Sequence, residues 1–523
     1  MALRSTKYDR QLRIWGEHGQ SALERAHICV LNCGPTGSEA LKNLVLGGIG
    51  SFTVVDASKV CASDLGNNYF VDWDSLGQSK AKTVSAFLHE LNDAVDAKFV
   101  EESPEALLES NPAFFSQFTL VIATQMQENS LLKLDEICRQ QNVMLIVARS
   151  YGLAGLLRIS VEEHDVIESK PDNKVEDLRL HNPWPELQRY VDEFDIDTTD
   201  NVIHKHIPFA VLLIKIAQDW KRAHNGKLPA NVRELKVNFL TITARRRVEE
   251  DEDNYTEALK SAYVVLFPPE ISPELHAILE DKSTEVNASS PDFWVMVAAL
   301  KQYIAKEGQG EPPLDGAIPD MHSFTDYYIK LQKIYQARAE ADVTAMVGHV
   351  SRILKQIGRD SSSIPRTTIK HFCKNTRHLR VLRCKTLRDE FSSKAGPELQ
   401  RLLANEESSH PALYVLLRAV DHFAATYNRY PGAFDGELEE DVSRLKAIAV
   451  SILNDMGGGG AALPEDLISE VCRFGAGEIH TVASIVGGIA SQEAIKLLTR
   501  QFTPVQGTFV YNAMSATSLV LNL

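Results

Sequence analysis

The sequence lacks long hydrophobic runs and two common catalytic motifs. No run of about 18 or more apolar residues occurs in the 523 residues, and the first ten, MALRSTKYDR, contain no apolar segment typical of a secretion signal. There is also no Gly-x-Ser-x-Gly elbow and no Gly-Lys-Ser/Thr phosphate loop. These absences argue against a membrane-spanning or secreted protein, and they give no sign of a hydrolase nucleophile or a P-loop.

Cysteine is scarce, and its spacing suits neither a disulfide framework nor a zinc site. The seven cysteines are odd in number, and no two of them form a Cys-x-x-Cys pair. This usage is typical of a reducing compartment, and we predict the nucleus and cytoplasm. The cysteines are Cys29, Cys33, Cys61, Cys138, Cys373, Cys384 and Cys472.

Basic residues are in deficit. The sequence has 55 Lys and Arg residues against 70 Asp and Glu residues, which gives a formal net charge of −15. General nucleic-acid binding needs a surplus of clustered basic residues, so this balance argues against it. The hydrophobic fraction of 44% is ordinary for a globular protein, and the length predicts more than one domain.

The sequence does contain a β-α-β pattern near its beginning. Residues 27–56, HICVLNCGPTGSEALKNLVLGGIGSFTVVD, combine an apolar run, a glycine-bearing turn, an apolar-periodic helix and a second apolar run that ends in Asp56. Alternating strands and helices continue to about residue 150, a pattern typical of a parallel sheet with helices on both faces. The sequence therefore predicts an α/β Rossmann-like domain. The predicted buried strands are Ile28–Leu31, Phe52–Val55, Lys98–Val100, Leu120–Ala123 and Met144–Val147.

The turn in this pattern is an incomplete nucleotide-binding fingerprint. An intact fingerprint reads Gly-x-Gly-x-x-Gly, whereas residues 32–37 read Asn-Cys-Gly-Pro-Thr-Gly. Gly34 matches the glycine that lets the backbone approach the phosphate, and Gly37 matches the one that lets the helix pack closely on the strand. The first glycine, which forms the tight turn, is replaced by Asn32. Pro35 also removes an N–H group that would face a phosphate. From these residues alone, a nucleotide site and a turn that binds nothing both stay open.

From about residue 166 to residue 470 the predictions are mainly helical. The longest predicted helix is Tyr327–Leu354, whose apolar residues recur at three- and four-residue steps. Residues 237–243, VNFLTIT, predict a strand. The last segment returns to an α/β pattern, so we predict one Rossmann-like domain from residues 1–165 and 471–523, interrupted by a helical insertion at 166–470. The helix of this last segment has small residues that favour close packing inside the fold or against a partner: Ala483, Gly487, Gly488 and Ala490.

Two other groups of residues have reactive or metal-binding side chains. Cys373 and Cys384 lie near several Lys and Arg residues, which activate a thiol, although a small buried side chain is the simpler interpretation of each. His204 and His206 offer two imidazoles, but no third ligand is near them in sequence. This arrangement disfavours a metal site.

Several segments resemble one protein family over nearly the whole chain. They are KYDRQLRIWGEHGQ (7–20), CGPTGSEALKNLVLGGIGSFTVVD (33–56), DLGNNYF (64–70) and EIHTVASIVGGIASQEAIKLLTRQF (478–502). These segments resemble the regulatory subunits of the neddylation activating enzyme, the family of the auxin-resistance and amyloid-precursor-protein-binding proteins. The family is part of the ubiquitin-activating, ThiF-like superfamily. The resemblance implies a ThiF/MoeB-like pseudo-adenylation domain with a cysteine-domain-like helical insertion.

Within that superfamily the sequence resembles the degenerate copy. Active copies have a complete glycine fingerprint, an Arg where this sequence has Asn67, and an Mg²⁺-binding Asp where it has Thr124-Gln125. No cysteine here lies between the Pro and Thr that flank the catalytic cysteine. The resemblance thus implies that this chain binds no cofactor and no metal, and that ATP and Mg²⁺ bind to the partner subunit. Four residues would then be remnants of a nucleotide site: Gly34, Gly37, Asp56 and Lys80. Of these, we expect Asp56 to cap the next turn and Lys80 to lie on the surface.

The resemblance assigns one catalytic role, in trans, to this chain. Arg10, in Tyr8-Asp9-Arg10-Gln11, matches the arginine that reaches across the dimer toward the ATP of the other subunit. Spacing alone predicts only that Arg10 and Arg13 share one exposed helix face.

The implied partners are the catalytic subunit, the ubiquitin-like modifier Nedd/Rub and the conjugating enzyme, with no nucleic acid and no membrane. The implied role is to support ATP-dependent adenylation and thioester formation by the catalytic subunit, which feeds cullin neddylation. No activity is expected of this chain alone. Two alternatives are a self-sufficient adenylating enzyme for ubiquitin-like proteins and a NAD-dependent oxidoreductase. The missing glycine at Asn32 speaks against both, because both bind nucleotide through an intact turn.

Overall fold

The structure is a computed structural model that describes residues 6–172, 176–198, 200–227, 252–266, 270–405, 408–457 and 462–523. The chain divides into two compact units. Unit 1 comprises Met1–Val166 and Val381–Leu523, and unit 2 comprises Ile167–Arg380. The strand predicted at 237–243 lies outside the described residues.

Unit 1 is built on an eight-stranded sheet with the strand order β10-β9-β6-β5-β4-β1-β2-β3. The five strands from β3 to β5 in this order are parallel, and β6, β9 and β10 extend the sheet in antiparallel fashion. This order confirms the predicted α/β Rossmann-like fold. The strands are β1 (His27–Leu31), β2 (Ser51–Val55), β3 (Asp96–Val100), β4 (Leu120–Thr124), β5 (Met144–Tyr151), β6 (Ala154–Ser160), β9 (Thr508–Asn512) and β10 (Thr517–Leu521).

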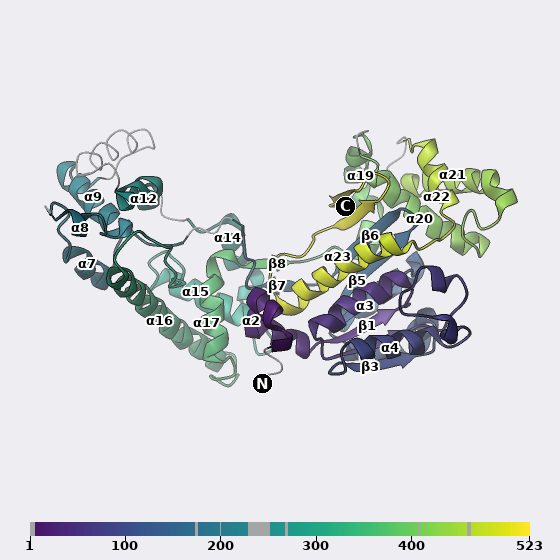
Figure 1. Cartoon of the computed structure of the whole chain (residues 1–523), viewed down its shortest axis with the longest axis horizontal. Helices are drawn as coiled ribbons and strands as arrows, with labels where there is room; N and C mark the ends of the chain where they lie inside the picture. Colours follow the sequence, from purple (N-terminus) through teal and green to yellow (C-terminus); the bar gives the residue numbers. More distant parts are fainter. Residues whose placement is uncertain are drawn as a thin grey trace. The chain divides into compact units, whose positions relative to one another are not determined.

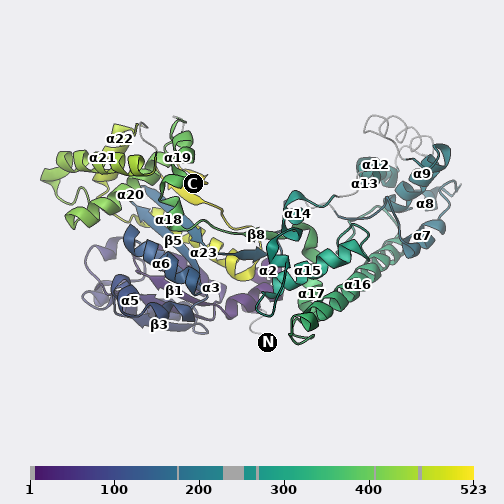
Figure 2. The ribbon, with the colours of Figure 1, turned by 180° about the vertical axis from the view of Figure 1, so that it is seen from behind.

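Helices cover both faces of this sheet. Figure 1 shows α3, α4 and α23 over one face, and Figure 2, from behind, shows α5 and α6 over the other. A separate two-stranded sheet pairs β7 (His164–Val166) with β8 (Arg380–Leu382). The helices of unit 1 are α2 (Asp9–Glu24), α3 (Pro35–Gly47), α4 (Lys80–Leu91), α5 (Pro104–Ser110), α6 (Glu128–Gln140), α18 (Leu387–Glu390), α19 (Gly396–Leu403), α20 (His410–Tyr427), α21 (Leu438–Asp455), α22 (Glu465–Arg473) and α23 (His480–Thr499).

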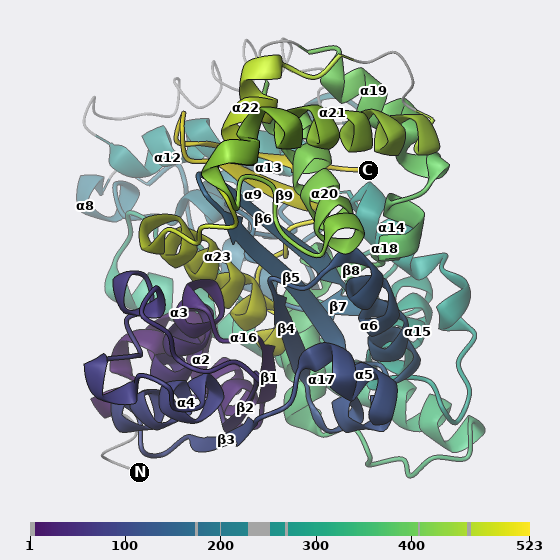
Figure 3. The ribbon, with the colours of Figure 1, turned by 90° about the vertical axis from the view of Figure 1, so that its right-hand side faces the viewer.

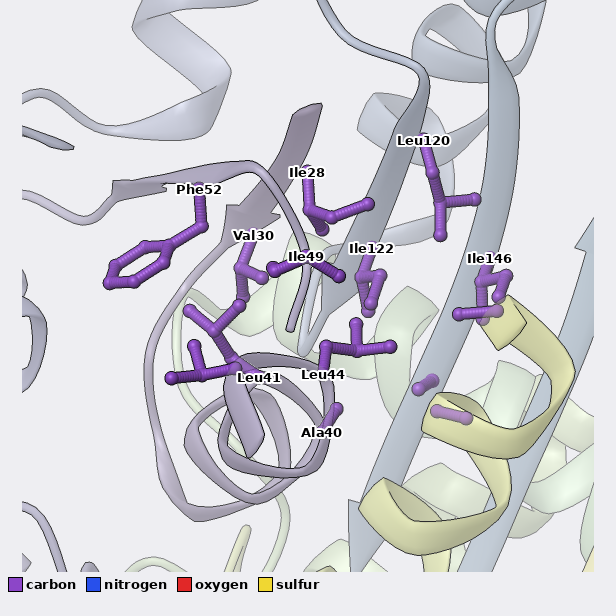
Figure 4. Close-up of a cluster of buried hydrophobic side chains, with 14 of the residues drawn as sticks. Ile28, Val30, Ala40, Leu41, Leu44, Ile49, Phe52, Leu120, Ile122 and Ile146 are labelled. Atoms are coloured by element: carbon purple, nitrogen blue, oxygen red, sulfur yellow. The ribbon is translucent and has the colours of Figure 1, made fainter. Parts of the chain in front are cut away.

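Neighbouring residues of each central strand face opposite buried clusters. Ile28 and Val30 of β1 pack toward α3, whereas Cys29 and Leu31 belong to the cluster under α5 and α6. Burial on both faces explains why these strands are continuous apolar runs in the sequence rather than alternating ones. Figure 4 shows the first cluster, to which the sheet contributes Ile28, Val30, Phe52, Leu120, Ile122 and Ile146, and α3 contributes Ala40, Leu41 and Leu44.

Strand β3 differs from the prediction of a buried strand at Lys98–Val100. It lies at the edge of the sheet and pairs only with β2. Its residues are exposed or half-buried, and Phe99 is 43% exposed. The prediction of a strand is right and that of burial is wrong, because a short apolar run does not reveal whether a second neighbour covers it.

Helix α23 brings the end of the chain back to the first β-α-β unit. A Cβ atom on Gly487 would lie 2.9 Å from the backbone of α3, at Ala40 N and Thr36 O, so only glycine permits this approach. Ala483 and Ala490 are fully buried on the same helix. Gly488, by contrast, has open space where a Cβ would lie. The predicted close packing therefore occurs inside the fold for three of the four small residues.

The two units divide the chain differently from the predicted domains at one boundary. Unit 1 resumes at Val381, whereas the predicted return begins at residue 471. Helices α20, α21 and α22 share a buried cluster with sheet residues Ala154 of β6 and Val510 of β9. The apolar periodicity of a helix identifies its buried face but not the surface on which that face packs, so the sequence did not reveal this attachment.

Unit 2 is helical in its described residues. Its longest helix, α16 (Thr325–Gln356), extends the predicted Tyr327–Leu354 by two residues at each end and packs against α15 and α17. Among the described residues, no helix has the length and apolar character needed to cross a membrane. The other helices of unit 2 are α7 (Pro185–Asp192), α8 (Asn201–His204), α9 (Phe209–Ala223), α12 (Asp253–Ser261), α13 (Tyr263–Leu266), α14 (Pro273–Leu279), α15 (Asp292–Ala305) and α17 (Arg366–Asn375).

Three buried ion pairs attach α18 and α20 to the sheet and to α6. Each joins a guanidinium to a carboxylate, and all six side chains are at most 11% exposed. A charge removed from water is tolerated only when its partner and further hydrogen bonds replace the solvent. The pairs are Arg149–Asp421 (2.5 Å), Arg158–Glu390 (2.5 Å) and Arg418–Glu128 (2.8 Å).

Asp421→Ala is expected to destabilise unit 1 by about 3–5 kcal/mol, because it leaves the Arg149 guanidinium buried without a counter-ion. Chemical denaturation of the full chain, followed by a probe in unit 1, measures the change. Glu465→Ala is the matched control, since Glu465 pairs with Lys446 at the surface and is 78% exposed, and a change below about 1 kcal/mol is expected there. If the two variants lose the same free energy of unfolding, the buried pair does not stabilise unit 1 more than the surface pair does.

Candidate functional site

The candidate site lies where β1, β2, β4 and β5 end, on the edge of the sheet that holds nucleotides in this type of fold. Figure 3 shows these strands side by side, with α3 and α23 on one side of them. β1 lies between β2 and β4. The strands after β1 are added on one side of it as far as β3 and then, from β4, on its other side. The turn at residues 32–37 follows β1, and α3 begins within it at Pro35, where the missing N–H of proline is tolerated.

Asn32 preserves the tight turn although it replaces a glycine. Its φ angle is +63°, in the left-handed region that asparagine tolerates better than most residues. Its side-chain amide donates a hydrogen bond to the carbonyl oxygen of Thr124 at 2.9 Å, which ties β1 to β4. The backbone at Asn32 therefore has the left-handed conformation that favours glycine, although the residue is asparagine.

An added Cβ on either remaining glycine of the turn would meet another group, which is backbone at Gly37 and the end of a side chain at Gly34. A Cβ on Gly37 would lie 2.5 Å from the carbonyl oxygen of Asn32, inside the contact distance of real Cβ atoms. A Cβ on Gly34 would lie 2.7 Å from Oε1 of Glu478, a residue more than 440 positions away in the chain. The side chain that approaches Gly34 is thus a carboxylate of this chain.

Glu478 is held against the first turn of α3 by several donors. Its Oε2 atom accepts a hydrogen bond from the Thr36 hydroxyl at 2.9 Å and a longer one from the Ser150 hydroxyl at 3.4 Å. The backbone N–H of Thr36 and the side chain of Gln125 lie near enough to this carboxylate to lower its pKa. Burial raises the pKa of Glu478, and these hydrogen bonds lower it without cancelling the effect of burial.

The segment that carries Glu478 is fixed on both sides. The backbone N–H of Gly152 donates to the carbonyl oxygen of Gly477 at 2.7 Å, and the Asn67 amide donates to that of Glu478 at 3.0 Å. The carbonyl oxygen of Asn67 in turn bonds to Nδ1 of His480 at 2.7 Å. Asn67, which stands where active copies of the superfamily have an arginine, therefore anchors this segment.

Asp56 shapes the backbone at the end of β2. Its Oδ2 atom accepts hydrogen bonds from the backbone N–H of Cys33 at 2.9 Å and from the Cys33 thiol at 3.3 Å. Its Oδ1 atom accepts bonds from the N–H and hydroxyl groups of Ser58 at 2.8 and 2.6 Å. Both carboxylate oxygens are thus used inside the chain, in the place where a ribose hydroxyl would bind.

Lys80 is not the surface residue suggested above. Its side chain is 13% exposed, and its Nζ atom forms an ion pair with Asp64 at 2.9 Å. Burial alone would lower the pKa of Lys80, but the hydrogen bond and charge of Asp64 raise it above its usual value. Burial would raise the pKa of Asp64, but hydrogen bonds from the backbone N–H of Cys61 and from Lys80 lower it below its usual value. The ammonium group is therefore already neutralised within the loop after β2.

The end of β4, at Thr124 and Gln125, offers no carboxylate as a ligand for Mg²⁺. The Thr124 hydroxyl lies within hydrogen-bond distance of the carbonyl oxygens of Asn32 and Leu31, at 2.7 and 3.0 Å, and donates to one of them, and the Gln125 amide donates to that of Ser150. Within the described residues, no group of three or more His, Cys, Asp or Glu side chains is arranged to hold a metal ion. His204 instead lies buried between Glu252 and Tyr255, at 2.6 and 2.9 Å.

Arg10 lies on α2, outside the turn, and is exposed. Arg13 on the same helix forms an ion pair with Asp9 at 3.2 Å and is 69% exposed. The helix bends at Gly16, whose φ angle of +66° is not helical. The structure thus groups Gly34, Gly37 and Asp56 at the turn but leaves Arg10 on the surface.

Sequence reasoning missed Glu478. It lies within a segment that carries the family resemblance, but nothing in its neighbourhood indicates that its side chain reaches the turn after β1. The packing of α23 on α3, together with the contacts of this segment to Gly152 and Asn67, brings the two together.

Comparison with known proteins now identifies the family. The ThiF family matches residues 8–521. The NEDD8-activating enzyme E1 regulatory subunit AXR1 of Arabidopsis thaliana is 58% identical, with 99% of this chain and 96% of that protein aligned. The regulatory subunit AXL of the same species is 57% identical over the full length of both chains, and that of Xenopus laevis is 42% identical over 100% of this chain and 99% of its own. The chain belongs to the NEDD8-activating enzyme E1 regulatory subunits of the ThiF family.

The cysteines of this family member are poor nucleophiles where they are buried. Burial raises the pKa of Cys29 and Cys33 well above the usual value, and it raises the pKa of Cys138 and Cys373 to about 12. Cys373 is therefore not activated by the basic residues near it in sequence. Cys61 alone is exposed among the seven, and Cys384 is half-buried.

Alkylation of the native chain with iodoacetamide at pH 8 is expected to modify Cys61 first. A pKa of about 12 leaves Cys373 with a thiolate fraction about a thousandfold below that of an ordinary thiol, and burial blocks access as well. Mass spectrometry of peptides after short exposure measures the order of labelling. Unfolding the chain in guanidinium chloride is the control and should expose all seven thiols; labelling of Cys373 as fast as Cys61 in the native chain would contradict this assignment.

Proposed function

We propose that this chain is the regulatory subunit of a NEDD8-activating enzyme and acts in a heterodimer with a catalytic subunit. The observation that carries this proposal is the 58% identity, over 99% of the chain, to a protein named NEDD8-activating enzyme E1 regulatory subunit AXR1. The turn after β1 supports the non-catalytic assignment, because its donors and the Asp56 carboxylate are already used within the chain.

In this proposal the catalytic subunit holds ATP, Mg²⁺ and the cysteine that forms the thioester, and this chain binds no cofactor. Three features support that division. Gln125 stands where an Mg²⁺-binding carboxylate would be needed, Lys80 is paired with Asp64, and the buried cysteines have raised pKa values. The contribution of this chain is then to complete and position the site of its partner.

Arg10 is the residue proposed to act across the dimer. Its exposure on α2 leaves the guanidinium available to a second protein. A guanidinium placed beside a triphosphate stabilises the negative charge that develops during adenylation, and its planar donors suit phosphate oxygens. The proposed partners also include the ubiquitin-like modifier NEDD8 and the conjugating enzyme, and the proposed setting is cullin neddylation in the nucleus and cytoplasm.

Co-expression with a candidate catalytic subunit tests the proposed function. A one-to-one complex that charges NEDD8 with ATP is expected, whereas the full chain alone should show no ATP–pyrophosphate exchange. The catalytic subunit alone is the matched control and should exchange poorly. Exchange by this chain without a partner would contradict the assignment and favour a self-sufficient adenylating enzyme.

Arg10→Ala is expected to slow ATP–pyrophosphate exchange by the reconstituted pair by about tenfold or more, because one charge-assisted contact to the developing anion is lost. Initial rates over a range of ATP concentrations measure the effect. Arg13→Ala is the control, since it removes the same charge one helical turn away, where the side chain already pairs with Asp9. If both variants keep full exchange while the complex still forms, Arg10 is not part of the partner's site.

A further inference from the structure

The turn after β1 keeps its glycines although the proposed function assigns it no nucleotide. Glycine is retained in such turns where a backbone has to approach a ligand closely. At Gly34 the group that approaches is the Glu478 carboxylate, since a Cβ there would lie 2.7 Å from Oε1. The close approach that a phosphate group would use is thus used by a carboxylate of the same chain.

The donors around Glu478 are those that a helix N-terminus offers to a phosphate group. The backbone N–H of Thr36 lies in the first turn of α3, where N–H groups have no partner within the helix. The Thr36 and Ser150 hydroxyls and the Gln125 side chain complete the set. A phosphate group presents similar oxygen acceptors with negative charge, so the same donors suit either anion.

We propose that Glu478 is the resident anion of this turn: its carboxylate occupies the place of a phosphate group, and the turn binds a phosphate group when that carboxylate is removed. The helix N-terminus and the hydroxyls are then an intact anion site, closed by an internal ligand. Removal of the internal ligand is what opens it, and Asn32 does not need to be changed for this, because its backbone already has the left-handed φ angle that glycine favours.

The state of Asp56 predicts which phosphate compounds bind. Its two carboxylate oxygens already accept four hydrogen bonds, from Cys33 and Ser58, so a ribose hydroxyl finds no free acceptor there. We therefore expect the opened site to recognise the phosphate group alone. Inorganic phosphate and AMP should bind the opened turn with similar affinity, whereas a clear preference for AMP would point to a nucleoside subsite as well.

The test is the thermal stabilisation of the full 523-residue chain, without a partner subunit, by inorganic phosphate and by AMP. Glu478→Ala is expected to lower the apparent Kd for phosphate by about tenfold or more relative to the unaltered chain, because the donors lose their internal competitor. Adding Thr36→Val to Glu478→Ala should reduce this gain, since it removes the hydroxyl donor with the shorter contact to the carboxylate. Glu465→Ala is the control for net charge, because it removes one carboxylate from the exposed surface of α22.

A phosphate affinity of Glu478→Ala equal to that of Glu465→Ala would overturn the proposal, and so would a gain that Thr36→Val leaves undiminished. A double-mutant cycle keeps it testable if the Glu478→Ala chain is too unstable for titration. Gly34→Ala should lower the Tm of the unaltered chain, because the new methyl group meets the carboxylate, and it should lower the Tm of a Glu478→Gly chain much less. Equal losses in both backgrounds would show that Glu478 does not occupy the turn. If this proposal about the turn fails, the proposed function is not affected, because adenylation by the heterodimer is measured in a separate experiment.

Discussion

The close contact between α3 and α23 is the constraint on which the rest of unit 1 depends. The two helices are separated by more than 430 residues, yet Gly487 brings their backbones so near that a single added carbon would collide with Thr36 and Ala40. This contact completes the core over one face of the sheet, with Ala483 and Ala490 buried along the same helix. It also sets the direction in which the preceding segment enters, and this direction places Glu478 at the turn.

The alternation of apolar runs and helices made most of unit 1 predictable. The five parallel strands lie within two residues of their predicted starts, because strands buried on both faces leave a strong apolar signal. The exposure of β3, and the attachment of the helices α20, α21 and α22 to the sheet, were not predictable in this way. Both depend on which neighbour covers a surface, and that information is spread over residues far apart in the sequence. The same limit applies to Glu478, whose partner Thr36 is 442 positions away.

The turn combines features that sequence reasoning would treat as opposites. Its glycines and Asp56 suggest a nucleotide site, and the residues at the end of β4 suggest that none remains. The structure explains both features, because each group that suggests a nucleotide site has a partner inside the chain. Gly34 leaves room for Glu478, and Lys80 pairs with Asp64. Asp56 accepts hydrogen bonds from Cys33 and Ser58. A degenerate copy can therefore retain the shape of a ligand site because its own side chains make the contacts that stabilise that shape.

The conformation of Asn32 has a consequence for how such copies are recognised. A glycine pattern tests for one residue type, yet the backbone at this position needs only a left-handed φ angle, which asparagine supplies while its amide bonds to Thr124. A missing glycine in a sequence profile is therefore a weak criterion for a lost binding turn. A stronger criterion is structural, namely whether an acidic side chain from elsewhere in the same protein fills the space beside the helix N-terminus.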